Sequence, residues 1–198
     1  GYGSSFPINR TFTTKELGFE TLKFNSVAAQ MSRGKSEKTV AFAMSSVAAT
    51  LSKFAMDVCL YTSQNFDFIS LPSHLTTGSS IMPHKKNPDV FELIRGKCNK
   101  IQALPYEITL ITNNLPSGYH RDLQLLKEGL FPAIENLKAC LDIAIFSIKD
   151  IQVKEHILND KKYDYLFTVD ALNELVVTGI PFRDAYKTVA EKLENETF

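Results

Sequence analysis

Cysteine is scarce in this sequence, with three among 198 residues. Cys59, Cys98 and Cys140 are widely spaced, and none belongs to a CxxC pair or lies near paired histidines. An odd number of cysteines in this pattern argues against both a disulfide framework and a zinc site. We therefore expect a protein of the reducing cytoplasm.

An excess of charge of one sign is also lacking, since 22 lysines and arginines balance 22 aspartates and glutamates. A neutral chain has no overall field to attract nucleic acid or an anionic membrane surface. No uninterrupted apolar run approaches the ~20 residues that span a bilayer. The chain is 44% hydrophobic and can bury a core. We expect a soluble protein without nucleic-acid or membrane partners.

The period-two alternation of β-strands is missing, whereas apolar residues recur at steps of three and four. The longest such stretch runs from Ser36 to Thr62 and predicts a long helix, with alanines at heptad spacing that allow close approach of a neighbour. Its expected apolar seam is Val40, Met44, Val47, Leu51, Phe54 and Val58. The pattern predicts an all-α fold, a bundle of long helices.

Start and stop signals predict helices on either side of this stretch. Thr13 and Glu16 form a capping-box pattern that predicts a first helix to Met31, with Gly34 as its stop. Asn87-Pro88-Asp89 predicts the start of a third helix, with a kink at Pro105. Its expected buried residues are Phe91, Ile94, Cys98 and Ile101.

A fourth helix is expected from about Glu128, and a small helical tail beyond Ile151. The apolar side expected for the fourth helix is Leu130, Ile134, Leu137, Leu141, Ile145 and Ile148. In the tail, one helix should end at Gly179 and the next should open at Pro181. We expect two domains, a central helical bundle over residues 1–150 and a small carboxy-terminal helical domain over 151–198.

The segment 77–88 is a polar, glycine-bearing loop between two predicted helices. It offers hydroxyls, two ammonium groups and a carboxamide just ahead of a helix start, where unpaired amides carry partial positive charge. Such an arrangement attracts a carboxylate or a phosphate. On composition alone, a solvated linker with an ordinary cap stays open as the alternative.

The order of residues in this loop, GSSIMPHKKNP at 78–88, resembles the signature of the fumarase and aspartase superfamily. The continuation NPD at 87–89 and ELIRGK at 92–97, with LPSGYHRDLQ at 115–124, resembles the argininosuccinate lyase family within it. SFPINR at 5–10 and GIPFRDA at 179–185 are similar to the same family. The resemblance therefore runs from one end of the chain to the other.

The resemblance implies a lyase that cleaves argininosuccinate to arginine and fumarate by proton abstraction and C–N elimination, a step of arginine biosynthesis. It implies Ser79 as the general base, Lys85 and Asn87 as holders of the succinate part, and Glu92 as the residue that orients a catalytic histidine. The full implied set is catalytic Ser79, Lys85 and Glu92, with Arg10, Ser80, Asn87, Tyr119, Gln124 and Lys127 as substrate-binding residues. No metal or organic cofactor is implied, because side chains can carry out both steps.

The implied catalytic histidine belongs to a threonine-histidine motif that this sequence does not contain. His74, His84, His120 and His156 stand in other contexts, and the family's histidine lies upstream of the stretch that this chain matches. The chain also begins at Gly1 without an initiator methionine. We therefore expect a truncated chain with an incomplete active site, inactive in isolation.

The resemblance also implies a homotetramer in which subunits share each active site. Two alternatives stay open: another fumarate-releasing enzyme such as adenylosuccinate lyase, and a non-catalytic helical scaffold like the eye-lens crystallins. The block from Tyr119 to Lys127 argues against the first, and the presence of Ser79, Lys85, Asn87 and Glu92 argues against the second. A nucleic-acid module on the basic residues around Lys85 and Arg95 is disfavoured, because the neutral charge and lack of interleaved aromatics supply little affinity.

Overall fold

The chain divides into two compact units, residues 1–152 and 153–198. A computed structural model describes residues 4–195 of the chain, so Gly1, Tyr2 and Gly3 of the unusual start lie outside the described residues. Most of the described chain is helical, and its strands are two residues long. The predicted all-α class is confirmed.

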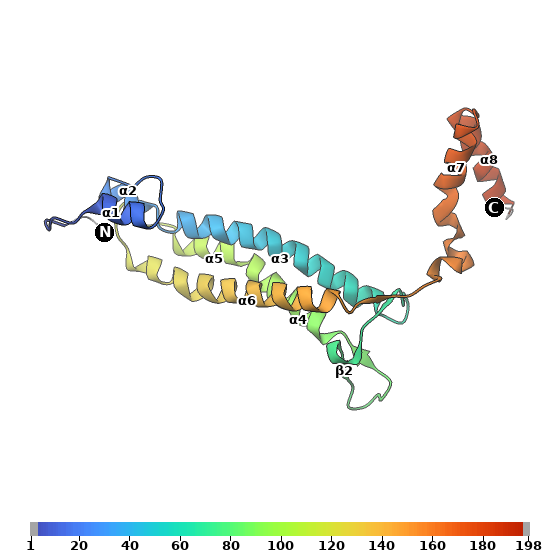
Figure 1. Cartoon of the computed structure of the whole chain (residues 1–198), viewed down its shortest axis with the longest axis horizontal. Helices are drawn as coiled ribbons and strands as arrows, with labels where there is room; N and C mark the ends of the chain where they lie inside the picture. The colour runs from blue at the N-terminus through green and yellow to red at the C-terminus, as the bar shows by residue number, and fades with distance from the viewer. Residues whose placement is uncertain (1–3, 196–198) are drawn as a thin grey trace. The chain divides into compact units, whose positions relative to one another are not determined.

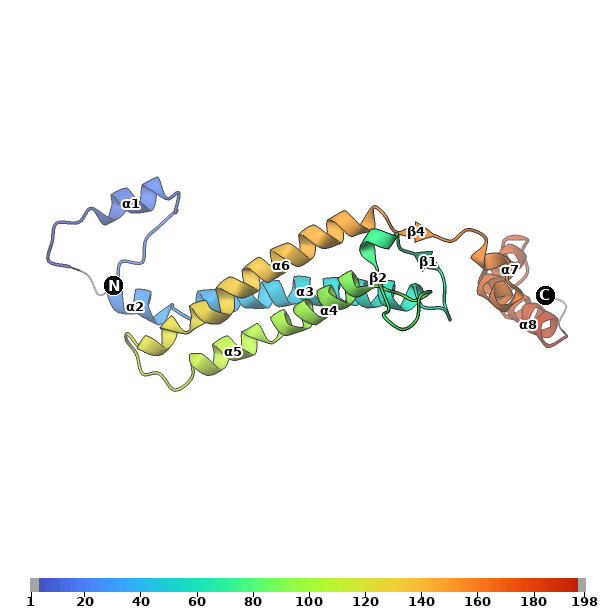
Figure 2. The ribbon, with the colours of Figure 1, turned by 90° about the horizontal axis from the view of Figure 1, so that it is seen from below.

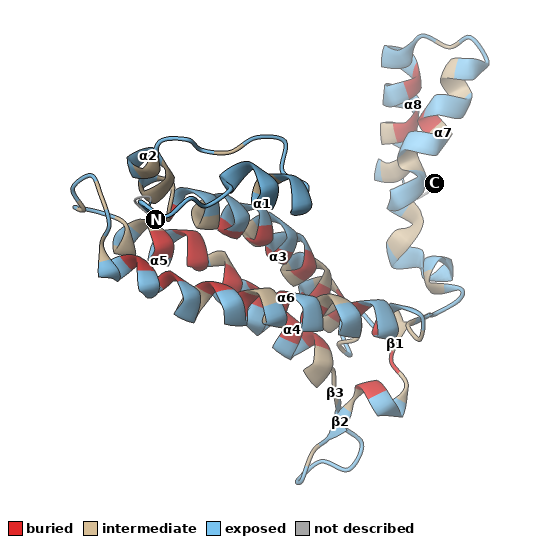
Figure 3. Cartoon of the chain, turned by 60° about the vertical axis from the view of Figure 1, so that its left-hand side comes forward, coloured by how far each residue is buried: buried red, intermediate tan, exposed pale blue. Residues whose placement is uncertain are grey.

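The first unit is a bundle of long helices (Figure 1). It comprises α3 (Lys35–Tyr61), α4 (Asp89–Gln102), α5 (Leu104–Ile111) and α6 (Leu126–Ile148). Helix α3 contacts the other three. The buried residues run as a stripe along the faces of these helices that point inward (Figure 3).

The predicted seam of α3 is confirmed at Met44, Leu51 and Val58 and differs by one helical position at the others. The residues that it buries are Ala41, Met44, Ala48, Leu51, Ala55 and Val58. Val40 and Val47, which we expected in the seam, are 45% and 44% exposed. Alanine at every other seam position brings the backbones of α3 and its neighbours close together, and the bulkier valines then stand beside the contact rather than in it.

Helix α6 shows the same effect. Its buried residues are Leu126, Leu130, Ala133, Leu137, Cys140, Ala144 and Ser147. Ile145 and Ile148, predicted on this side, are mostly exposed, while Ile134 and Leu141 are half-buried. The prediction for α4 is confirmed, since Phe91, Ile94, Cys98 and Ile101 are all buried.

The predicted first helix, from Thr13 to Met31, is wrong. Two short helices occupy this region, α1 (Arg10–Glu16) and α2 (Ser26–Met31), and each is capped by an asparagine side chain, Asn9 and Asn25. Gly18 turns the chain with φ +71° and separates them. Gly34, with φ +81°, opens α3, and its amide donates to the carboxylate of Glu37 at 2.7 Å.

Short elements connect the long helices. Between α3 and α4 lie β1 (Ile69–Ser70), η1 (Ser73–Leu75), β2 (Thr77–Gly78) and β3 (Lys86–Asn87), and η2 (Arg121–Gln124) precedes α6. Helix α4 begins one residue later than predicted, because Pro88 rather than Asn87 is its N-cap. Near the kink predicted at Pro105 the helix is interrupted: α4 ends at Gln102, and Pro105 lies in the first turn of α5.

The second unit contains η3 (Ile157–Asn159), η4 (Lys161–Phe167), α7 (Thr168–Val177) and α8 (Phe182–Glu194), and β4 (Gln152–Val153) lies at the boundary between the units. Leu172, Ala185 and Val189 form its small core. The two predicted tail helices are thus confirmed. Their assignment to a separate carboxy-terminal domain of the family fold stays a prediction.

One stretch, Ser26–Tyr61, is long and apolar enough to cross a membrane by length and composition. This finding differs from our expectation that no stretch approaches that length. Within the bundle, the seam of α3 is buried against α4, α5 and α6. Core helices of bundles pass the same test of composition, so the finding alone is weak support for a membrane span.

Two of the three cysteines lie inside the bundle. Cys98 of α4 and Cys140 of α6 are buried free thiols. Burial and, second to it, the neighbouring Cys140 raise the pKa of the Cys98 thiol to about 12. The Cys98 thiol is therefore neutral at physiological pH, and both buried cysteines pack as small apolar side chains.

The side chain of Phe91 is central to the α3–α4 contact, since it is fully buried and its ring meets that of Phe54 edge-on at 5.9 Å between centroids. We expect Phe91→Ala to lower the free energy of unfolding by about 3–5 kcal/mol, because the cavity cannot close around a rigid seam. Urea unfolding followed by far-ultraviolet circular dichroism measures this. The exposed Lys97→Ala on the same helix should change stability by less than about 0.5 kcal/mol, and an equal loss in both variants would contradict the prediction.

Candidate functional site

The loop predicted to carry the chemistry is a hairpin at one end of the bundle. Strands β2 and β3 pair antiparallel, with Thr77 opposite Asn87 and Gly78 opposite Lys86. The hydroxyl oxygen of Ser79 accepts hydrogen bonds from the amides of Ile81 at 3.2 Å and Met82 at 3.1 Å. Ser79 is half-buried, whereas Ser80 and Lys85 are exposed. Two backbone amides of the hairpin therefore point at the Ser79 oxygen.

The base of the hairpin is joined to the start of α4. The Thr77 hydroxyl donates to the carboxylate of Asp89, in the first turn of α4. Asn87 is half-buried beside it, and Glu92 lies one turn further along the helix and is exposed. Near Glu92, burial raises the pKa of the Cys59 thiol of α3, Arg95 lowers it, and Glu92 raises it slightly. Ser79, Ser80, Lys85 and Asn87 belong to the hairpin and Glu92 to the first turn of α4; we call these five residues the loop group.

A second group of predicted residues lies where η2 leads into α6. Gln124 donates from its side-chain nitrogen to the Tyr119 hydroxyl at 3.2 Å, and the exposed Lys127 follows in the first turn of α6. We call Tyr119, Gln124 and Lys127 the tyrosine group. A small cavity of about 140 Å³ beneath this segment is lined in part by Arg33, Thr112 and Leu123.

Arg33 fixes the segment that carries the tyrosine group. Its guanidinium donates to the backbone carbonyl of Leu123 at 2.9 Å, and Leu123 is itself buried. The next residue along the chain, Gly34, faces the side chains of Thr112 and Leu123 so closely that a β-carbon would collide with Thr112. The amino end of α3 and the η2 segment are therefore packed together.

The two groups lie at opposite ends of α3. The amino end of α3 meets η2 through Arg33, whereas Thr62, just past its other end, borders a hollow shared with Lys86 and Pro88 at the base of the hairpin. Figures 1 and 2 show the same separation in two views. At 1.5 Å per residue, the 27 residues of α3 set the groups about 40 Å apart. No small substrate can touch both groups of one chain.

Arg10, the remaining predicted residue, is engaged elsewhere. Its guanidinium donates to the backbone carbonyls of Lys23 at 3.0 Å and Phe24 at 3.2 Å. It therefore closes the segment between α1 and α2. Its predicted role in substrate binding stays a prediction, as do the roles of the loop group and the tyrosine group.

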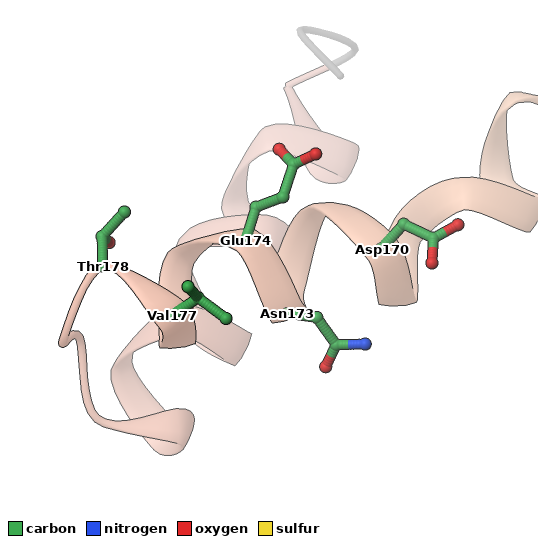
Figure 4. Close-up of a pocket in the computed structure, with 5 residues that line it drawn as sticks. All are labelled: Asp170, Asn173, Glu174, Val177 and Thr178. Atoms are coloured by element: carbon green, nitrogen blue, oxygen red, sulfur yellow. The ribbon is translucent and has the colours of Figure 1, made fainter.

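A hollow in the second unit does not fit the expected chemistry. It lies on one face of α7 and is lined by Asp170, Asn173, Glu174, Val177 and Thr178 (Figure 4). Its two carboxylates would repel a dicarboxylate such as fumarate. None of the predicted site residues lines it.

The sequence did not point to Arg33, Thr77 or Asp89 as parts of these groups. Arg33 acts on a carbonyl 90 residues away, and no local pattern marks such a pairing. Thr77 and Asp89 flank the hairpin, and the start of α4 at Asp89 was the only available signal. Their role follows from the hydrogen bond rather than from residue type.

Comparison with solved structures identifies the fold of the chain, and comparison with family models identifies its family. The fold matches that of an EDDS lyase in complex with formate with a TM-score of 0.72 and 24% identity, over 98% of this chain and 39% of that one. This likeness shows the fold, a bundle of long helices. A family model described as Lyase matches residues 1–103, and the chain belongs to this lyase family.

Curated relatives agree over the whole chain. The argininosuccinate lyase of Parabacteroides distasonis is 60% identical over 198 residues, all of this chain and 44% of that protein. The argininosuccinate lyase of Bacteroides fragilis is 58% identical over 194 residues, 98% of this chain and 43% of that protein. The resemblance expected from the loop is confirmed. The chain spans less than half the length of these relatives.

The hydrogen bond from Arg33 to Leu123 should contribute to stability, because a half-buried charged donor satisfies a carbonyl at the end of η2. We expect Arg33→Met, which keeps most of the stem and removes the donors, to cost about 1–2 kcal/mol, or about 3–6 °C in Tm. Thermal unfolding measures it. The exposed Lys35→Met should leave Tm nearly unchanged, and an unchanged Tm in Arg33→Met would contradict the proposed packing of η2 on α3.

Proposed function

We propose that this chain provides part of an argininosuccinate lyase, which releases arginine and fumarate from argininosuccinate. The observation that carries the proposal is the hairpin 77–87. Its residues follow the GSSIMPHKKNP order of 78–88, and two of its backbone amides donate to the Ser79 oxygen. The identity of 60% to an argininosuccinate lyase over all 198 residues supports it. The chemistry proposed for the residues follows from these two facts.

Proton abstraction is the difficult step. A carbon next to an ionised carboxylate is a weak acid, so the base and the doubly charged intermediate both need stabilisation. In our proposal Ser79 acts as an alkoxide that takes the proton and becomes a hydroxyl, and the electrons left on carbon then form the double bond of fumarate as the C–N bond breaks toward nitrogen. The amides of Ile81 and Met82 already bond this oxygen at 3.2 and 3.1 Å. As an alkoxide, the oxygen would be stabilised by the same two donors.

The substrate would be held from both sides. Lys85 and Asn87 would neutralise and bond the carboxylates of the succinate part, while Ser80 would add a hydroxyl donor from the same hairpin. Arg10, Tyr119, Gln124 and Lys127 would bind the rest of the molecule. Glu92 would orient a histidine that this chain does not supply in the expected motif.

The distance between the groups supports an oligomer in our proposal. The loop group and the tyrosine group are about 40 Å apart in one chain, so one substrate can reach both only if they come from different chains. Exposed apolar side chains on the long helices offer area for such contacts, among them Val40, Val47, Leu93, Tyr106, Ile145 and Ile148. We propose a homotetramer of the cytoplasm, and a mass of one 22.2 kDa chain at micromolar concentration would contradict it.

Fumarate release tests the proposed reaction. The chain should be assayed by ultraviolet absorbance with argininosuccinate and with adenylosuccinate, alone and co-expressed with the part of the Parabacteroides distasonis relative that it does not match. We expect fumarate from argininosuccinate in the co-expressed sample. In that sample Ser79→Ala should lower kcat by about 10²–10⁴-fold, because it removes the base. Ser73→Ala, in η1 just before the hairpin, should leave kcat unchanged.

Other outcomes of the fumarate assay would contradict different parts of the proposal. Fumarate from the chain alone would show that no essential part is missing. Fumarate from adenylosuccinate instead would overturn the substrate, and silence in every sample would favour a non-catalytic scaffold. Full activity in Ser79→Ala would remove that serine from the mechanism.

Shared sites predict rescue between two inactive variants. Ser79→Ala damages the loop group, and Gln124→Ala damages the tyrosine group. If a site takes one group from each of two chains, co-expression of both variants restores roughly a quarter of the sites when chains mix at random. We expect fumarate release to return to about that fraction. Co-expression of Ser79→Ala with Lys85→Ala, both in the loop group, should give no return, and equal activity in both mixtures would contradict shared sites.

A further inference from the structure

We infer that the hydrogen bond between Thr77 and Asp89 is the anchor of the hairpin, and that it positions Ser79 and Lys85 for the reaction. The inference rests on the proposed function for its catalytic consequence. It deepens that proposal by naming two positioning residues outside the predicted set. Neither side chain is required to touch the substrate.

The first support is where the bond lies. Thr77 opens β2 and Asp89 opens α4, so the bond joins the strand that enters the hairpin to the helix that leaves it. Beyond it, the paired backbone consists of two residues on each side. A two-stranded pair this short is marginal by itself. An added side-chain bond at its base therefore has a large effect on how often the pair opens.

The second support is what lies on each side of the bond. The residues of the hairpin tip, from Ser80 to Lys86, are exposed, whereas Asn87, Pro88 and Asp89 are half-buried and lead into the buried Phe91. The Asp89 carboxylate thus stands on a helix fixed in the core, and the Thr77 hydroxyl stands on the strand that carries Ser79 two residues later. Because α4 is fixed in the core, the bond also holds β2 in place.

The third support is the organisation of the tip itself. Ser79 is tied to Ile81 and Met82, and the Lys85 amide donates to the Met82 carbonyl at 3.0 Å. The tip is therefore a folded turn that can move as one body. Its orientation depends on the two strands that support it, so a change at Thr77 or Asp89 should rotate Ser79 and Lys85 together.

Amide hydrogen exchange over residues 76–88 tests the anchor in the chain itself, without any assay of activity. Thr77→Val keeps the shape and removes the donor, and we expect exchange in this segment to rise about tenfold. Thr77→Ser should restore protection, since it keeps the hydroxyl. Thr76→Val is the matched control, because the Thr76 hydroxyl bonds Ser73 rather than Asp89. Unchanged exchange in Thr77→Val would overturn the anchor.

A double-mutant cycle separates this bond from a general loss of structure. If Thr77 and Asp89 act through each other, exchange in Thr77→Val/Asp89→Ala should be no faster than in Asp89→Ala alone. Multiplying effects in the double variant would mean that the two residues act independently, and would overturn the inference. The exchange of α6 in the same samples should not change, and a rise there would show that the variants unfold the bundle.

Kinetics in the active co-expressed sample test the catalytic consequence. We expect Thr77→Val to lower kcat about tenfold, because Ser79 is displaced from the reacting carbon, and to raise KM as well, because Lys85 moves with Ser79. Thr77→Ser should recover kcat. Unchanged kcat with raised exchange would leave an anchor without a role in positioning and would overturn the second half of the inference. If no sample releases fumarate, the proposed function fails while the exchange results still decide the anchor.

Discussion

The close contact of α3 with its neighbours is the constraint on which the rest of the structure depends. Ala41, Ala48 and Ala55 are completely buried and recur at heptad spacing. With so little side chain between them, the helices pack along nearly the whole length of α3, and Phe91 of α4 fills the space beside Phe54. A helix held over this length is stiff, and it fixes where both of its ends lie.

That stiffness decides the form of the candidate site. The hairpin is attached near one end of α3, and the η2 segment is tied to the other by Arg33. The two groups cannot approach each other in one chain without breaking the seam. A site that uses both must be assembled from separate chains, so the same packing that stabilises the fold also makes self-association a condition of the proposed chemistry.

Periodicity predicted the helices well where the side chains themselves decide the packing. The α4 stripe from Phe91 to Ile101 was correct because most of the apolar residues there recur along one helical face, with Leu93 off that face and exposed. In α3 and α6 the prediction was correct for residues such as Met44, Leu51 and Leu130, but at the positions that it missed it favoured valine and isoleucine, whereas the structure buries alanine, cysteine and serine. Hydrophobicity alone does not reveal that close backbone approach excludes branched side chains, because that depends on the partner helix.

The prediction of one helix in the amino-terminal region was wrong for a different reason. The apolar spacing from Leu17 to Met31 fits a helix, but Gly18 adopts a positive φ and Asn25 caps a new start. Two local backbone preferences therefore overrode a regular pattern. For the candidate site, sequence identified the residues of the hairpin through their order, yet the separation of the groups could not be read from it. The separation depends on the length of α3, because the two groups lie at its opposite ends.

The hydrogen bonds that Ser79 accepts explain how the loop could support the proposed chemistry. A free serine hydroxyl is a poor base at neutral pH, and a serine in an open coil would have only water to stabilise its oxyanion. In the hairpin, two amides point at the oxygen before any substrate is present. Donors that are fixed in advance need no reorganisation when charge develops, so their contribution is larger than that of mobile water. This advantage lasts only while the turn keeps its shape and its place, which is why the strands and the bond at their base would matter to the proposed reaction.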